Sequence, residues 1–165
     1  MKPRTFAPWV APIADRDRAA RARLLEFARS VLRETWWNEP TPSGWTRREV
    51  LAHIAGDTGK WFDHILGSIV GSVPIDPGRA SPLAPTDTMN AADIWERRDH
   101  SLSKLIAEIE ADGQRHLDLL AQLADEHRDA ILAPHATSVF AFLSRNPAGN
   151  RGAHDLEHLA ELREV

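Results

Sequence analysis

The chain has 165 residues, and its 20 lysines and arginines against 24 aspartates and glutamates give a formal net charge of −4. That length is typical of one domain, so we expect residues 1–165 to form a single domain. No run approaches the roughly 18–20 consecutive apolar residues that a membrane span needs. The N-terminus has three early prolines and lacks the apolar segment of a secretory signal. We therefore expect a cytoplasmic protein that does not bind membranes, and its acidic charge argues against nucleic-acid binding.

The sequence contains no cysteine and eight histidines. This excludes disulfides, cysteine nucleophiles, and zinc or iron–sulfur sites held by thiolates. Any metal ion must therefore be bound by His, Asp or Glu side chains.

Eleven prolines divide the chain and leave four proline-free stretches in which long helices can form. In the first stretch, apolar side chains recur at helical spacing over 15–35, which predicts a helix. Its arginines and Asp17 are expected on the solvated side. Residues 38–44, which contain two prolines and a glycine, end this helix.

The second predicted helix, over 47–70, has the clearest start signal in the chain. Thr46 and Glu49 have the spacing of a capping box, in which each side chain satisfies a backbone donor at the other position. Gly56 and Gly59 each cost this helix roughly 1 kcal/mol. Close approach of another helix, or room for a ligand, would explain them.

A long loop is expected at 71–89, which holds four prolines and no periodicity. Loops of that length usually form a lid or a subunit contact, or are disordered. Asn90 can cap a third helix over 91–124. We expect the Asp112–Gly113 pair to kink or break that helix, because glycine is unfavourable within a helix.

A short turn at 138–143 precedes a fourth helix, which begins near Asn146 or Asn150 and runs to the C-terminus. No segment shows the period-2 alternation typical of strands. Four helices without strands predict an all-α four-helix bundle.

Two histidines lie four residues apart in the last predicted helix. His154 and His158 are about 40° apart around a helix, so both imidazoles can reach one metal ion. A pair of solvated histidines explains the spacing equally well. A third ligand would come from another helix, and His53, at the margin of an apolar stripe, is the candidate. That position suits a residue lining a cleft, and it suits a surface histidine almost as well.

Other polar residues are weaker candidates. Asp57 lies one turn after His53, where it could act as a general base or orient a ligand, and a solvated position is equally consistent. His64 is expected on a solvated flank, and Asp93 on a solvated face. The remaining histidines are expected on the surface or in loops: His100, His116, His127 and His135.

Four tryptophans surround the first helical hairpin: Trp36, Trp37, Trp45 and Trp61. Core packing or a subunit contact is the usual reason for such a group, and an aromatic ligand pocket is the second.

Three segments resemble the DinB/YfiT-like superfamily. Residues 44–54, GWTRREVLAHI, are similar to its second-helix signature, in which a tryptophan precedes a capped helix that carries a metal ligand. Residues 89–102 resemble the start of its third helix. Residues 154–159, HDLEHL, are similar to its last-helix motif, which carries two further histidines. The resemblance covers about residues 15–165.

The resemblance implies an up-down-down-up four-helix bundle, often dimeric, whose metal ligands are His53, His154 and His158. It implies a divalent ion, zinc or nickel first and iron or manganese next, and a low-molecular-weight thiol as cosubstrate. Related branches include bacterial thiol-dependent S-transferases, the N-terminal domain of mycothiol-dependent maleylpyruvate isomerase, and small self-resistance hydrolases. This chain has His154 where the isomerase pattern tends to have glutamate.

These relationships lead us to expect a metal-dependent transferase or hydrolase that acts on a small molecule. Three histidine ligands would leave an open coordination position, as in catalytic sites, and Asp57 is the candidate catalytic residue. The alternative is a non-catalytic bundle that serves stress response or dimerisation.

We also expect a homodimer. A single small core seldom encloses six tryptophans fully, and aromatic residues on a surface tend to mark contacts. Residues 71–89 and 6–9 are apolar enough to pack across a two-fold axis. Alternatively, both segments fold back over their own bundle and cover the metal cleft as a lid.

Overall fold

The computed structural model describes residues 4–57, 63–71, 86–132, 136–145 and 149–164. Most of these residues are helical, so the all-α class is confirmed. The α-helices in this part of the chain are α1 (Ala11–Ser30), α2 (Arg47–Asp57), α3 (Asp63–Ile69), α4 (Thr86–Arg97), α5 (Leu102–Leu120), α6 (Val139–Arg145) and α7 (Arg151–Arg163). Short 3₁₀ helices form at η1 (Glu34–Asn38) and η3 (Asp125–His127).

One small sheet was not expected. Strands β1 (Ile131–Leu132) and β2 (Thr137–Ser138) pair antiparallel, so the prediction that the chain has no strands was wrong in this detail. Two residues per strand are too few to produce a readable alternation, which is why the sequence did not predict them.

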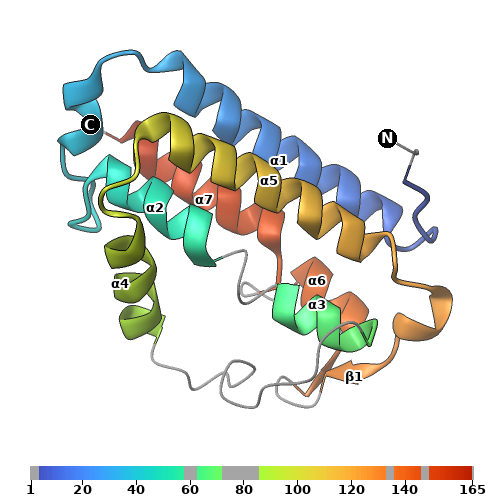
Figure 1. Ribbon diagram of the computed structural model, residues 1–165. Helices are drawn as coiled ribbons and strands as arrows, with labels where there is room; N and C mark the ends of the chain where they lie inside the picture. The colour runs from blue at the N-terminus through green and yellow to red at the C-terminus, as the bar shows by residue number, and fades with distance from the viewer. Residues whose placement is uncertain (1–3, 58–62, 72–85, 133–135, 146–148, 165) are drawn as a thin grey trace.

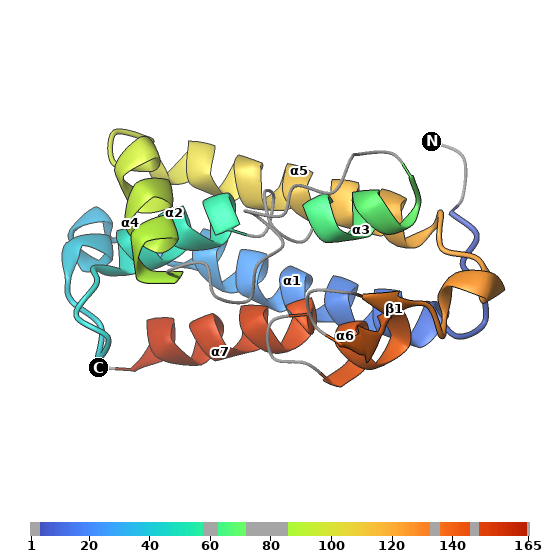
Figure 2. The same cartoon turned by 90° about the horizontal axis from the view of Figure 1, so that it is seen from below.

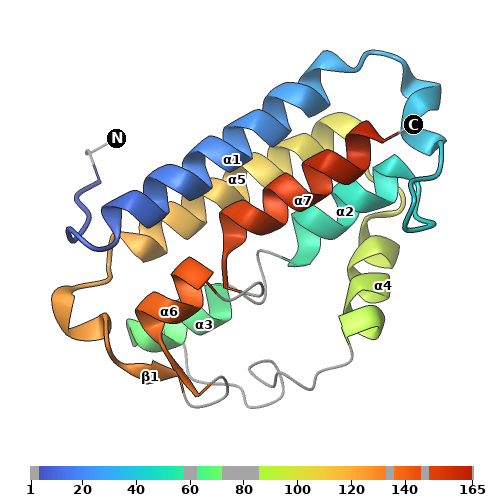
Figure 3. The ribbon, with the colours of Figure 1, turned by 180° about the vertical axis from the view of Figure 1, so that it is seen from behind.

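The long helices α1 and α5 run side by side, and α7 and α2 lie along them (Figures 1 and 3). Helix α4 packs against α2 at one end of the molecule. The elements α3, α6 and β1 gather at the other end, as the view from below shows (Figure 2). The up-down-down-up order of a four-helix bundle stays a prediction.

The apolar core consists of two clusters. One lies where α1, α2, α5 and α7 meet and includes Leu24, Trp37, Ile54, Ile109 and Leu162. The other lies among α3, α6, the start of α1 and the end of α5. It includes Val10, Ile13, Leu66, Leu120 and Phe142. Phe6 and Trp9 pack against this second cluster, so the N-terminal stretch folds back on its own chain.

A buried polar layer separates the two apolar clusters. Its charged members come from the middle of α1, the middle of α5 and the start of α7: Asp17, Arg21, Asp112, His116, Arg151 and Asp155. The expectation that Asp17, His116 and the arginines of the first helix are solvated was therefore wrong for Asp17, His116 and Arg21. A polar residue on an amphipathic helix is normally exposed. These three residues are buried because their hydrogen-bonding and charged partners lie on other helices, far away in the sequence.

Several predicted helix boundaries differ from those observed. The first helix begins earlier, at Ala11, because Pro12 is tolerated in a first turn. It ends at Ser30, and the following residues form η1 rather than extending it to residue 35. The predicted helix over 47–70 is divided into α2 and α3, whose connecting residues lie outside the described ones.

The third predicted helix is broken, but not at Asp112–Gly113. Helix α5 passes through that pair without interruption, and the break falls instead between Arg97 and Leu102. The reason is a cap, since the Ser101 side chain accepts a hydrogen bond from the backbone N–H of Lys104 at 3.2 Å. Helix α4 begins at Thr86, within the segment expected to be a loop, and residues 72–85 lie outside the described part.

Among the described residues, no helix is both long enough and apolar enough to cross a membrane.

Candidate metal centre

Two capped helices carry the three histidines of the predicted metal site. Helix α2 begins with the predicted capping box, which is confirmed. The Thr46 N–H donates to Glu49 Oε2 at 2.7 Å, and the Glu49 N–H donates to Thr46 Oγ1 at 3.2 Å. Helix α7 begins after Asn150, whose Oδ1 accepts from the Ala153 N–H at 3.0 Å. Both helix starts are thus fixed by local hydrogen bonds that the sequence specifies.

The structure brings His53, His154 and His158 together. Each ring offers one nitrogen, and these three nitrogens lie within 4.8 Å of one another. The ring centroids are 5.4 Å apart for His53 and His154, 5.0 Å for His53 and His158, and 4.5 Å for the two histidines of α7. Imidazole nitrogens bind zinc at about 2.0–2.1 Å, so a small closure of these side chains would place one ion among them.

His53 is the buried member of the cluster. Only 4 % of the residue is exposed, and the Trp45 ring lies with its centroid 5.2 Å from that of His53. Among the described residues, its buried Nδ1 has no hydrogen-bond partner. An unsatisfied buried nitrogen costs about 1–3 kcal/mol, and an ion or molecule bound in the cluster is one way to offset that cost. The donor set therefore fits a divalent metal ion.

Burial keeps two of the rings neutral. Burial, with a smaller contribution from His158, lowers the pKa of His53 from 6.5 to about 4, and Glu161 acts in the opposite direction. Burial also lowers the pKa of His154 well below its usual value, and His158, His53, Arg151 and Arg21 add to this effect. Metal ions bind the neutral form of imidazole, so these environments favour ligation at neutral pH.

A carboxylate orients the third ring. His158 Nδ1 lies 3.0 Å from Glu161 Oε2, so Nε2 is the nitrogen of this ring that is left to bind a metal ion. Glu161 in turn accepts hydrogen bonds from the hydroxyls of Thr41, at 2.7 Å, and Ser43. Burial alone would raise the pKa of Glu161, but the hydrogen bonds from Ser43, Thr41 and His158 outweigh burial and hold it below its usual value.

Glu161 was not identified from the sequence. Metal-binding histidines usually donate their second nitrogen to a carboxylate or carbonyl. The three-residue spacing from His158 to Glu161 on one helix was therefore an available signal.

The structure does not test the role predicted for Asp57. Its backbone ends α2, one turn after His53, and its side chain lies outside the described residues, as do Gly59 and Trp61. His64 is buried, with 9 % exposed, so the predicted solvated flank was wrong.

Asp93 is also buried, because Gly56 has no side chain in the space that Asp93 occupies. A Cβ at position 56 would lie 2.6 Å from the Asp93 Cβ, so the glycine permits the close approach of α4 that its position in the sequence suggested.

A separate cavity of about 600 Å³ opens between α1 and α5. Its inner wall is part of the buried polar layer, including Asp17, Arg21 and His116. Among the described residues that line it, none belongs to the histidine cluster.

Most of the chain matches a known protein family. The model of the mycothiol maleylpyruvate isomerase N-terminal domain matches residues 17–155, a span that includes His53 and His154 and ends before His158. Neither the curated proteins nor the solved structures that were compared gave a match. Because the matched span covers most of the chain, the protein belongs to the family of mycothiol maleylpyruvate isomerase N-terminal domains, within the DinB-like superfamily.

Proposed function

We propose that His53, His154 and His158 bind one divalent metal ion, zinc or nickel first, and that the chain uses it in a thiol-dependent S-transfer to a small molecule. The observation that carries this proposal is the cluster itself, in which three histidines from two helices offer nitrogens within 4.8 Å of one another. Three ligands leave at least one coordination position open, which distinguishes catalytic sites from closed structural ones.

Each residue of the site has a role in this proposal. Burial holds His53 and His154 neutral and ready to bind. Glu161 holds the His158 ring with Nε2 toward the site, and Thr41 and Ser43 hold Glu161. The Trp45 ring packs beside the ring of His53. A bound divalent cation would favour the thiolate form of a thiol cosubstrate.

The thiol belongs to the proposal because the matching family is named for a mycothiol-dependent enzyme. In the S-transfer, the thiolate sulfur forms a bond to an electrophilic carbon, the leaving group departs with the bonding electron pair, and the thiol proton goes to solvent. Asp57, the last residue of α2, is the candidate base that takes this proton and releases it to solvent.

The metal content of the purified chain is the first test. We expect about one divalent ion per chain in the wild type and a large loss in His53→Ala. His100→Ala is the matched control, since it removes a histidine that contacts Glu108 outside the cluster. A wild-type chain that retains no ion after incubation with zinc or nickel would overturn the proposal.

Activity is the second test. The metal-loaded chain is incubated with mycothiol and chlorodinitrobenzene, and formation of the thioether is followed by absorbance. We expect turnover that His53→Ala abolishes and His100→Ala retains. A chain that holds the ion but does not accelerate conjugation with this or other electrophiles would favour the hydrolase or the non-catalytic alternative.

A further inference from the structure

The first turns of α7 are held by two side chains of α1. Asp17 Oδ1 accepts a hydrogen bond from the Gly152 N–H at 2.9 Å. Arg21 donates to both carboxylate oxygens of Asp155, from Nε at 2.7 Å and from Nη2 at 2.9 Å. We call these four residues the α1–α7 clamp.

We propose that Asp17 and Arg21 are positioning residues, which set the orientation of α7 and thereby aim His154 and His158 at His53. This inference rests on the proposed metal site. Asp155 directly follows His154, so the position of one side chain constrains the other.

The clamp is rigid because it is buried and attached to a third helix. Asp17, Arg21 and Asp155 are each no more than 6 % exposed. Arg21 Nη1 also donates to the backbone carbonyl of Ile109 in α5 at 2.9 Å. A two-pronged contact between guanidinium and carboxylate fixes direction as well as distance. The side of α7 that faces α1 is therefore fixed relative to both α1 and α5.

A small rotation of α7 would disrupt the site. Side-chain atoms at the outer surface of a helix lie about 5–6 Å from its axis, so a 20° roll moves them by about 2 Å. Metal–ligand distances tolerate deviations of only about 0.2 Å. Apolar packing alone permits more variation than that, because cores accept many rearrangements of similar volume.

Stability alone does not account for the clamp. Buried ion pairs are often no more stabilising than apolar side chains of the same size, because both charges lose their hydration. The sequence also provides space for the contact, since a Cβ at Gly152 would lie 2.8 Å from Asp17 Oδ1. A fixed orientation of α7 explains both features.

The test separates orientation from stability. In the double variant Arg21→Met/Asp155→Leu, apolar side chains of similar size replace the ion pair. We expect the thermal midpoint of the metal-free protein to stay within a few degrees of the wild type. The zinc affinity, measured by competition with a chromophoric chelator, should fall at least tenfold. The absorption spectrum of bound cobalt should change as well, since it reports ligand geometry.

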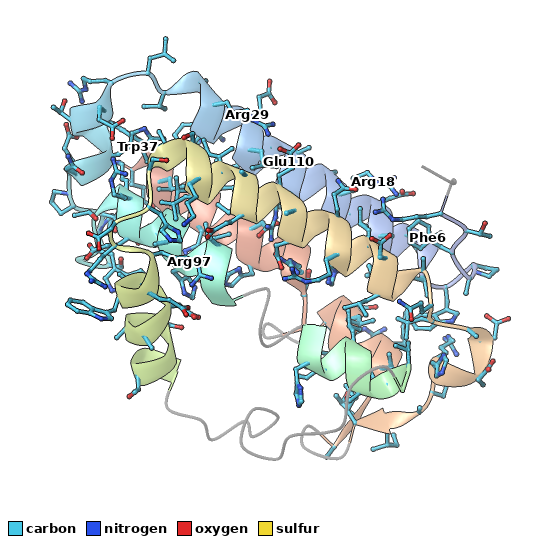
Figure 4. The ribbon with its side chains drawn as sticks, in the orientation of Figure 1. Phe6, Arg18, Arg29, Trp37, Arg97 and Glu110 are labelled. Carbon is cyan, nitrogen blue, oxygen red and sulfur yellow. The ribbon has the colours of Figure 1, made fainter. Side chains whose placement is uncertain are left out.

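The matched control is Arg29→Met/Glu110→Leu. It removes an ion pair of 2.6 Å that joins α1 to α5 on the surface, where the two side chains point toward each other (Figure 4). Its zinc affinity should equal that of the wild type. A zinc affinity of the clamp variant within twofold of the wild type would overturn the inference.

Two further measurements keep the inference testable. If the double variant does not fold, Arg21→Lys replaces it, because lysine keeps the charge and loses the two-pronged contact. At least threefold weaker zinc binding supports the clamp, and unchanged binding overturns it. If the wild type binds no ion, the proposed function fails on its own. The crystal structure of the double variant then decides, and unchanged positions of His154 and His158 relative to His53 overturn the clamp.

Discussion

Replacement of Glu161 tests whether the orientation of His158 matters for metal binding. The Glu161 carboxylate accepts from His158 Nδ1 at 3.0 Å and from Thr41 Oγ1 at 2.7 Å. Glutamine keeps the shape of this side chain. Its amide oxygen can still accept from His158, while its NH₂ group turns toward the hydroxyl oxygens of Thr41 and Ser43. Glu161→Gln therefore loses the charge and keeps most of the geometry, whereas Glu161→Ala loses both.

Loss of a carboxylate that hydrogen-bonds to a metal-binding histidine typically lowers metal affinity about 10–100-fold. We expect Glu161→Gln to weaken zinc binding about tenfold, which is about 1.4 kcal/mol. Glu161→Ala should weaken it about 100-fold, which is about 2.7 kcal/mol. The affinity is measured by competition with a chromophoric chelator at a fixed neutral pH, where the carboxylate is ionised.

The control is Glu157→Gln, since Glu157 is exposed on the same helix, one residue before His158. It removes an equal charge close to the site without touching a ligand. Equal weakening by Glu157→Gln would mean that only the net charge of α7 matters. Affinities of both Glu161 variants within twofold of the wild type would refute the role assigned to Glu161.

Further predictions concern stability, pH, catalysis and assembly. Thr46→Ala should lower the free energy of unfolding by about 0.5–2 kcal/mol, because α2 loses its cap, and an unchanged urea midpoint would contradict this. Because folding lowers the pKa of His53 from 6.5 to about 4, the unfolded chain binds more protons between these values. The free energy of unfolding of the metal-free protein should therefore fall by about 3 kcal/mol, owing to this residue, as the pH falls from about 7 to 4. Urea unfolding in the presence of chelator measures this loss, and it should be smaller in His53→Gln. Asp57→Asn should keep the metal content and lower turnover at least tenfold; equal turnover would exclude Asp57 as the base. Light scattering at micromolar concentration should give twice the chain mass of 18.4 kDa, and a mass near 18.4 kDa would exclude a stable homodimer.

Local signals in the sequence predicted local features. The capping box at Thr46 and Glu49 involves residues three apart, and the pair His154 and His158 involves residues four apart. Such spacings depend only on helix geometry, so they can be recognised without knowledge of the fold. The position of His53 at the margin of an apolar stripe made it only a candidate third ligand, because spacing within one helix says nothing about which helices meet. The family resemblance then assigned it to the same site.

Contacts between distant residues could not be predicted in the same way. Arg21 and Asp155 are 134 positions apart, and each resembles an ordinary solvated residue within its own helix. The break before Leu102 was missed for a different reason. Ser101 offered a cap, but Asp112–Gly113 appeared to be the weaker part of the helix. Helix α5 continues through this pair, and Gly113 leaves room for Arg21, since a Cβ there would lie 3.2 Å from Arg21 Cγ.

Four polar contacts of α7 follow one another at intervals of three residues, at Gly152, Asp155, His158 and Glu161. A turn of α-helix takes 3.6 residues, so each step of three falls 60° short of a full turn, and the nine residues from first to last shift the line of contacts by 180°. The first two positions face α1, and the last faces Thr41 and Ser43. Contacts from α1 therefore hold the first turns of α7, and contacts from Thr41 and Ser43 hold its last turn. His154 lies within the first set, and His158 lies between the two sets. Insertion or deletion of one residue between Asp155 and Glu161 would rotate the contacts at one end of α7 by 100° relative to those at the other end. We therefore expect the length of this segment to tolerate no change.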